Sequence, residues 1–124
     1  MDNVYHFDGF LKGRNSVTKK GGFTVFKNGK LLIEQNISGD KIFTNNEAEL
    51  LGCWYACKCA EPNSEIVTDS MNTIAWVKRG ASKARPDLNP IMLECKKLIA
   101  EKKLDLYWRP RAENQAGNYN EFEK

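Results

Sequence analysis

The sequence has no apolar run that approaches the roughly 18 residues needed to cross a bilayer, so we do not expect a membrane-spanning protein. Internal repeats and low-complexity linkers are also absent, and residues 1–124 are predicted to form one domain. The first ten residues, MDNVYHFDGF, lack the basic-then-apolar pattern of a secretory signal. The expected location is therefore the cytoplasm.

Histidine is nearly absent, with His6 the only one, and no CxxC pair is present. Cys53, Cys57 and Cys59 are close together in the sequence, as metal-binding cysteines often are, but their spacing is not that of a zinc site. Cys53 and Cys57 are one helical turn apart in an apolar run, which favours buried core thiols. Reduced cysteines are expected, and one bridge to Cys95 stays open.

Neither sign of charge is in large excess, since the net charge is +3. The hydrophobic share of 41% and the charged share of 28% are typical of a soluble globular domain. Small basic groups either follow a phosphate backbone or form solvated faces. These groups are Lys12, Arg14, Lys19 and Lys20; Lys78, Arg79, Lys83 and Arg85; and Arg109 with Arg111.

The first half of the chain contains clear strand, turn and helix signals. Residues 3–8 are β-rich, and Asn28-Gly29 between two strand-like runs predicts an antiparallel hairpin. Thr44, followed three residues later by Glu47, forms a capping box in front of an amphipathic helix.

The second half alternates strands and helices. The pattern predicts strands at 64–69 and 104–108, a short helix at 70–80, a helix that begins at Asn89-Pro90, and a polar tail from 108 to 124. This order predicts an α/β fold, a mixed five-stranded sheet with three antiparallel strands and then parallel strands, flanked by helices and followed by a short C-terminal tail.

Three acidic residues are predicted to converge at one edge of this sheet. Asp8 and Asp69 each end a strand, and Glu49 lies in the first turns of the helix that joins those strands. Carboxylates gathered in this way suit Mg²⁺ or Mn²⁺, and a pair of such ions is the arrangement that cleaves phosphodiesters. Taken singly, each acid is also explained as a turn residue or as a helix-dipole partner.

Three segments, FDGF (7–10), TNNEAEL (44–50) and VTDS (67–70), resemble type 1 ribonuclease H over nearly the whole chain. The resemblance implies an endonuclease that cuts the RNA strand of an RNA/DNA hybrid with two Mg²⁺ or Mn²⁺ ions and leaves a 5′-phosphate. It implies Asp8, Glu49 and Asp69 as catalytic metal ligands, with the Gly9 backbone beside them. A monomer is expected.

The C-terminal segment departs from the family pattern. The family has an asparagine after the last strand and an aspartate four residues later, and here these positions are Asn114 and Asn118. Asn118 is therefore expected as a fourth catalytic and metal-site residue without the charge, and Glu121 could partly substitute if the tail is helical. The alternative function is a weakened or inactive hybrid-binding module.

The resemblance also implies substrate contacts. Asn45 and Asn46 match residues that contact the RNA minor groove, and Ser70 is expected to make a similar contact. The alternative for these residues is helix capping, a role that Thr44 already fills. Arg109 and Arg111 either contact phosphate or solvate their loop, and Trp76 lies either against the DNA strand or in the core. The substrate-binding residues are thus expected to be Thr44, Asn45, Asn46, Ser70, Trp76, Arg109, Arg111 and Asn114.

Other family features are missing. The loop at 108–113 has no histidine, the basic protrusion is cut back, and the C-terminal helix is expected to be nearly absent. His6 is interpreted as a core or site-edge residue, with a proton shuttle as the alternative. A DNA-directed relative such as a transposase shares the carboxylates but not TNNEAEL.

Overall fold

The computed structural model describes residues 3–11 and 17–123. Within these ranges no helix is both long and apolar enough to cross a membrane. In chain order the elements are β1 (Val4–Leu11), β2 (Val17–Lys27), β3 (Lys30–Thr44), α1 (Asn45–Cys59), β4 (Glu65–Thr68), α2 (Met71–Arg79), the 3-10 turn η1 (Pro86–Leu88), α3 (Asn89–Lys102), β5 (Asp105–Trp108), the 3-10 turn η2 (Arg111–Glu113) and α4 (Gln115–Glu123).

The strands form one mixed sheet in the order β3-β2-β1-β4-β5. The first three strands pair antiparallel, and β4 is parallel to both β1 and β5. This confirms the sheet predicted from the sequence. Because β4 pairs with β1 only over Val4–His6, Asp8 lies just past the point where these strands separate, next to the end of β4.

The hairpin between β2 and β3 turns at Asn28-Gly29, as the sequence predicts. Both residues have positive φ, 51° and 83°, as a two-residue type I′ turn requires. Lys27 pairs with Lys30 across the turn, and this pairing sets the register of β2 against β3. In the neighbouring pair of β1 and β2, Thr24 lies opposite Asp8.

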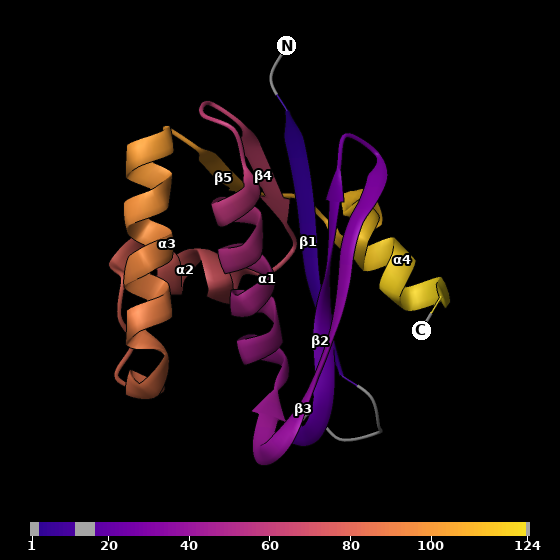
Figure 1. Ribbon diagram of the computed structural model, residues 1–124, viewed down its shortest axis with the longest axis vertical. Helices are drawn as coiled ribbons and strands as arrows, with labels where there is room; N and C mark the ends of the chain where they lie inside the picture. The colour runs from indigo at the N-terminus through magenta and orange to yellow at the C-terminus, as the bar shows by residue number, and fades with distance from the viewer. Residues whose placement is uncertain (1–2, 12–16, 124) are drawn as a thin grey trace.

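Residues of β1 alternate between two covered faces. Phe7 lies against Gly52 of α1, whereas Asp8 and its cross-strand partner Thr24 face Asn120 of α4. Figure 1 shows α1 and α3 in front of the sheet and α4 at its other side. The end of β1 therefore lies between a helix from the middle of the chain and the last helix.

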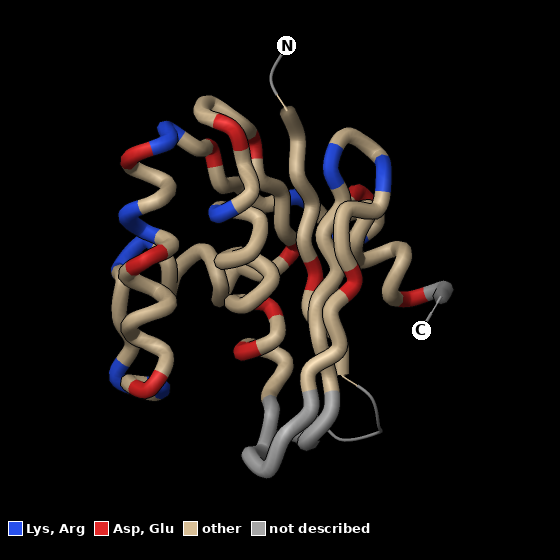
Figure 2. The backbone as a smooth tube through the Cα atoms, in the orientation of Figure 1, with Lys and Arg blue, Asp and Glu red and all other residues tan. Residues whose placement is uncertain are grey.

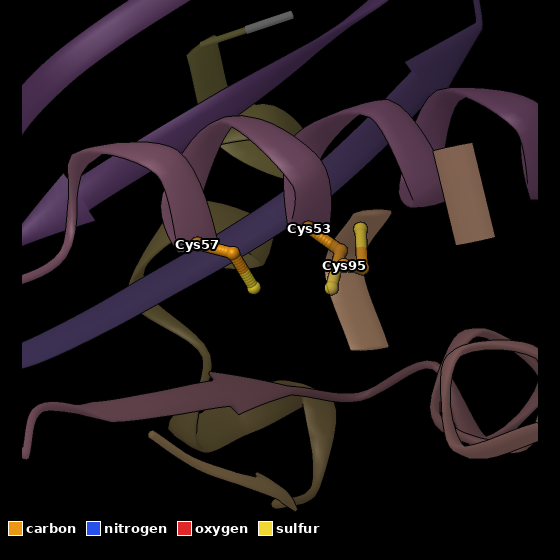
Figure 3. A group of neighbouring side chains, drawn as sticks. All are labelled: Cys53, Cys57 and Cys95. Atoms are coloured by element: carbon orange, nitrogen blue, oxygen red, sulfur yellow. The ribbon is translucent and has the colours of Figure 1, made fainter. Parts of the chain in front are cut away.

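The largest part of the core lies between the sheet, α1 and α3, and it includes three cysteines. Cys53 and Cys57 of α1 and Cys95 of α3 are fully buried, with their sulfur atoms within 4.8 Å of one another (Figure 3). All four cysteines are free thiols, and Cys59 is exposed. The buried-thiol interpretation is confirmed for Cys53 and Cys57, and no bridge to Cys95 is formed.

We expect one thiol to react rapidly with an aromatic disulfide reagent in the folded protein and four in denaturant, because a thiolate must be exposed to attack. Cys59→Ser should abolish the fast reaction and leave three thiols in denaturant. Rapid reaction of two or more thiols in the native protein would contradict the packing of α1 against α3.

The C-terminal segment is helical, so the expectation of a nearly absent C-terminal helix is wrong. Asn114 accepts hydrogen bonds from the backbone N–H groups of Ala116 and Gly117, at 3.0 and 3.2 Å, and so caps α4. Ala116 is fully buried, and the Tyr119 ring packs on Phe26 with ring centroids 5.6 Å apart. The sequence of α4, QAGNYNEFE, has few large apolar residues, so it lacks the apolar periodicity that would have predicted a helix.

Candidate active site

Three carboxylates meet at the edge of the sheet where β1 and β4 separate. Asp8, Glu49 and Asp69 each offer an oxygen within 4.8 Å of the others. Asp8 is fully buried and Glu49 is 4% exposed, whereas the Asp69 side chain is 13% exposed. The structure thus brings together the three acids that the sequence pointed to.

Close packing of β1 on α1 sets the position of Glu49. A Cβ atom on Gly9 would lie 2.5 Å from the backbone nitrogen of Glu49 and 2.7 Å from the carbonyl carbon of Ala48. Only glycine allows this approach. Thr44 fixes where the helix begins, because its hydroxyl accepts a hydrogen bond from the Glu47 N–H at 3.2 Å.

Burial and like charge make the carboxylates hard to ionise together. Desolvation raises the pKa of Asp8 to about 6, against a hydrogen bond from Asn120 that lowers it and the charge of Asp69 that raises it further. Desolvation and the charge of Asp8 also raise the pKa of Glu49 well above its ordinary value, although the Gly9 backbone hydrogen bond opposes this. Without a bound cation, the protein therefore stabilises the ionised forms of Asp8 and Glu49 only in part.

Two carboxyl oxygens have no hydrogen-bond partner within the described chain. They are Asp8 Oδ1 and Glu49 Oε2, both on buried residues. Buried oxygens of this kind are costly unless a proton or a cation compensates them. Carboxylate oxygens are hard ligands, which suit the hard cations Mg²⁺ and Mn²⁺.

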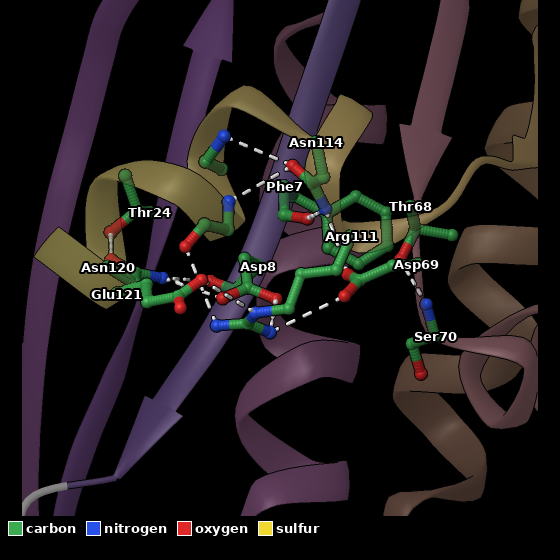
Figure 4. A network of polar contacts seen from close by, with 12 residues as sticks. Phe7, Asp8, Thr24, Thr68, Asp69, Ser70, Arg111, Asn114, Asn120 and Glu121 are labelled. Atoms are coloured by element: carbon green, nitrogen blue, oxygen red, sulfur yellow. Dashed lines mark hydrogen bonds and ion pairs between the residues drawn. The ribbon is translucent and has the colours of Figure 1, made fainter.

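Arg111 supplies the positive charge nearest to the carboxylates in the described chain. Its Nη1 lies 3.4 Å from Asp69 Oδ2 and 3.7 Å from Asp8 Oδ1, and its Nε lies 3.6 Å from Glu121 Oε2. Figure 4 shows the guanidinium between these side chains. Burial lowers the pKa of Arg111, but the carboxylates outweigh this and raise it.

Two asparagines connect the C-terminal segment to the site. Asn114 donates to the Phe7 carbonyl and to Asp69 Oδ1, both at 2.9 Å, and it is fully buried. Asn120 donates to Asp8 Oδ2 at 3.0 Å, and its oxygen accepts from the Thr24 hydroxyl at 2.6 Å. The Asn114 amide is thus used within the protein, and its predicted contact with substrate stays a prediction.

The side chain of Asn118 makes its hydrogen bond away from the three carboxylates, and its role as a metal ligand stays a prediction. Its amide donates to the Ala112 carbonyl at 3.0 Å, within the C-terminal segment itself. A hollow of about 300 Å³ beside the carboxylates is lined by Gly9, Asn45, Glu49, Arg111, Asn120 and Glu121, among others, but not by Asn118. The helical turn of α4 directs Asn120 and Glu121 toward the site instead.

Of the residues predicted to contact the RNA strand, the two asparagines at the start of α1 are free to do so. Asn45 and Asn46 are exposed, and Asn45 lines the hollow. Thr44 and Ser70 are engaged as helix caps, with Ser70 accepting from the Thr73 N–H at 3.1 Å.

The remaining predicted contacts divide between surface and core. Arg109 is exposed over the Tyr107 ring. Trp76 is 7% exposed and belongs to the core, which agrees with the core alternative, and its contact with the DNA strand stays a prediction. One edge of Trp76 still lines a hollow that also contains Arg79 and Lys83. Lys12, Arg14 and the side chains of Lys19 and Lys20 lie outside the described part of the structure.

His6 is half-buried, on the strand face that carries Asp8. Its ring hydrogen-bonds the Glu113 backbone, and burial lowers its pKa. The structure thus places it beneath η2, at the border of the site.

Neither a family model nor a curated protein matches this chain, but many solved structures do. The N-terminal RNase H domain of a Mycobacterium tuberculosis protein, solved as a fusion with maltose-binding protein, is 20% identical, with a TM-score of 0.70 over 97% of this chain and 94% of that one. RNase H1 from the halophilic archaeon Halobacterium salinarum is 19% identical, with a TM-score of 0.69 over the whole of both chains.

A third structure contains nucleic acid. LC11-RNase H1, which another of the matching structures describes as isolated from compost, was solved in complex with an RNA/DNA hybrid. It is 21% identical, with a TM-score of 0.63 over 91% of this chain and 88% of that one. Together with the strand order and the helices on both faces, these matches show that the chain has the fold of type 1 ribonuclease H.

Proposed function

We propose that this protein is an endoribonuclease that hydrolyses the RNA strand of RNA/DNA hybrids with two divalent ions and gives 5′-phosphate products. The observation that supports this most directly is the trio of Asp8, Glu49 and Asp69, gathered beside an open hollow, with two buried carboxyl oxygens that have no hydrogen-bond partner in the described chain. The same fold with a bound hybrid in LC11-RNase H1 supports the choice of substrate.

Asp8, Glu49 and Asp69 would hold the ions, and Asn120 and Gly9 keep two of these ligands in place. Asn120 fixes the rotamer of Asp8 from one side, and the Gly9 backbone bonds Glu49 from the other. Mg²⁺ or Mn²⁺, when bound, would lower the pKa of the attacking water and neutralise charge on the phosphate. Asn118, which the family pattern suggests as a fourth ligand, remains a proposal that variants can test.

The chain offers polar groups suited to each strand of a hybrid. Asn45 and Asn46 at the open start of α1 are placed to meet 2′-hydroxyl groups, the feature by which proteins distinguish RNA from DNA. Arg79 and Lys83 line a second hollow of about 850 Å³, and their charges suit the phosphates of the second strand. Figure 2 shows basic residues along α3 and the loop before it, interspersed with acidic ones.

The decisive experiment is hydrolysis of an end-labelled RNA/DNA hybrid in Mg²⁺ and in Mn²⁺, with DNA duplex and RNA duplex as controls. We expect cleavage of the hybrid alone, with 5′-phosphate ends. A second candidate function, a non-catalytic hybrid-binding module, is favoured by one observation, which is that Arg111 rather than a fourth carboxylate lies next to Asp8 and Asp69. Binding of the hybrid without cleavage in either ion would select it.

Hybrid binding should weaken steeply with salt, because lysine and arginine side chains release counterions from the phosphates. Arg79→Gln combined with Lys83→Gln should lower affinity and reduce the slope of log K against log salt by about one or two. Glu101→Gln, an exposed change on the same helical layer, is the control. Affinity that does not respond to salt would point to a small-molecule site.

Two asparagines on the same helix, two residues apart, separate the competing assignments for the C-terminal segment. Asn120→Ala should lower cleavage by about ten- to a hundredfold, because it removes the donor that positions a metal ligand. Asn118→Ala should cost less than threefold, since its amide bonds only the Ala112 carbonyl. If initial rates show the reverse order, Asn118 is the working ligand that the family pattern suggests.

A further inference from the structure

Arg111 lies closer to Asp8 and Asp69 than a phosphate contact alone would require. It follows β5 in the η2 turn, and its guanidinium lies within 4 Å of three different acids, Asp8, Asp69 and Glu121. Two of those acids are the ones that would hold the ions. The positive charge of Arg111 therefore lies next to the oxygens that divalent cations would bind.

The contacts of the Arg111 guanidinium are numerous but long. Its ion-pair distances run from 3.4 to 3.7 Å, and Nη2 reaches the Gly117 carbonyl at 3.5 Å. The side chain is 49% exposed. An arginine held in this way can leave without breaking a short bidentate pair, and its long side chain can turn toward solvent.

The charge on the surrounding residues explains why a protein cation is present. Asn118 and Asn120 bring amides to the C-terminal segment, and the described acids next to the guanidinium are Asp8, Asp69 and Glu121. In the ion-free protein the carboxylates repel one another, and Arg111 is the nearest group that offsets this repulsion. When Mg²⁺ or Mn²⁺ arrives, the arginine and the ion compete for the same oxygens.

We propose that Arg111 is an exchangeable counter-ion, which pairs with Asp8 and Asp69 in the substrate-free protein, is displaced by the divalent ions, and then binds a phosphate of the hybrid. This inference rests on the proposed function. The guanidinium lines the same hollow as Gly9, Asn45 and Glu49, so a phosphate held over the carboxylates comes within its reach. Its planar donor fork fits a phosphate as well as a carboxylate.

The first test is Mn²⁺ binding to the substrate-free protein, measured by calorimetry. Arg111→Gln should tighten Mn²⁺ binding by about tenfold, because it removes a positive charge next to two ligands. The Mn²⁺ affinity of Arg111→Lys should stay near that of the wild type, because this variant keeps the positive charge. The same variant shows whether the fold tolerates a substitution at this position. Arg109→Gln is the matched control, because it removes the same charge from the same loop at a side chain paired with Glu113 instead.

The second test is hybrid affinity, with Ca²⁺ and with EDTA. Arg111→Gln should weaken binding severalfold in Ca²⁺, where the ions release the guanidinium for the phosphate, and have little effect in EDTA, where it stays with the carboxylates. Equal Mn²⁺ affinity in Arg111→Gln and Arg109→Gln, or an equal loss of hybrid affinity with and without ions, would overturn the counter-ion role. If the wild type binds no Mn²⁺, or if Asp69→Asn leaves Mn²⁺ binding unchanged, the proposed function itself is overturned.

Discussion

Asp8→Asn, Glu49→Gln and Asp69→Asn should each lower hybrid cleavage by at least about a thousandfold, because a catalytic metal site contributes several kcal/mol to the barrier. Each change keeps the shape of the side chain and removes one charged ligand from a cluster whose oxygens lie within 4.8 Å of one another. Initial rates in saturating Mg²⁺ and Mn²⁺, at pH 8, are the measurement.

The control for this series is Glu101→Gln, which removes a carboxylate from the exposed end of α3. It should retain the wild-type rate. Circular dichroism of the three site variants should match the wild type, so that the loss reflects chemistry and not unfolding. Wild-type turnover in any one of them would remove that residue from the site.

The second large effect is a loss of stability of the ion-free protein as the pH rises. Burial raises the pKa of Asp8 from an ordinary 3.8 to about 6. Burial and the charge of Asp8 also raise the pKa of Glu49 well above its ordinary value. The folded state thus binds these protons more tightly than the unfolded state. The stability from protonation is fully present below about pH 4, and Asp8 alone loses roughly 3 kcal/mol of it as the pH passes 6.

Denaturant unfolding in EDTA between pH 4 and 8 measures this loss. Asp8→Asn should flatten the decline, because it removes one of the two groups that must ionise inside the protein. His6 gives a slope of opposite sign, since burial lowers its pKa, so the comparison with Asp8→Asn isolates the carboxylate. Mg²⁺ at pH 8 should raise the free energy of unfolding of the wild type, and should raise that of Asp8→Asn by a smaller amount. A stability that rises through this range in EDTA would contradict the buried, uncompensated cluster.

Local sequence signals predicted most of the scaffold because each has its own physical cause. Asn28-Gly29 favours the positive φ angles of the hairpin, and Thr44 provides the cap that starts α1. From these and the strand order, the meeting of Asp8 with Asp69 follows without knowledge of side-chain packing.

The contacts that the sequence did not reveal join distant parts of the chain. Asn120 and Asp8 are 112 residues apart, and no pattern within α4 marks Asn120 as a partner rather than a solvent-facing amide. Asn114 was expected to bind substrate, but a helix begins directly after it and uses its side chain as a cap. Trp76 was left open between core and surface, since a short helix presents an aromatic side chain equally well to either.

The docking of α4 against Asp8 also has a consequence for the order of synthesis. The three carboxylates leave the ribosome within the first 69 residues, but the amide that orients Asp8 belongs to α4, Gln115–Glu123. A nascent chain that has made the sheet and α1 thus exposes its acids without their partner. The site would acquire its finished geometry only after residues 115–123 have been translated and have folded back onto the first strand.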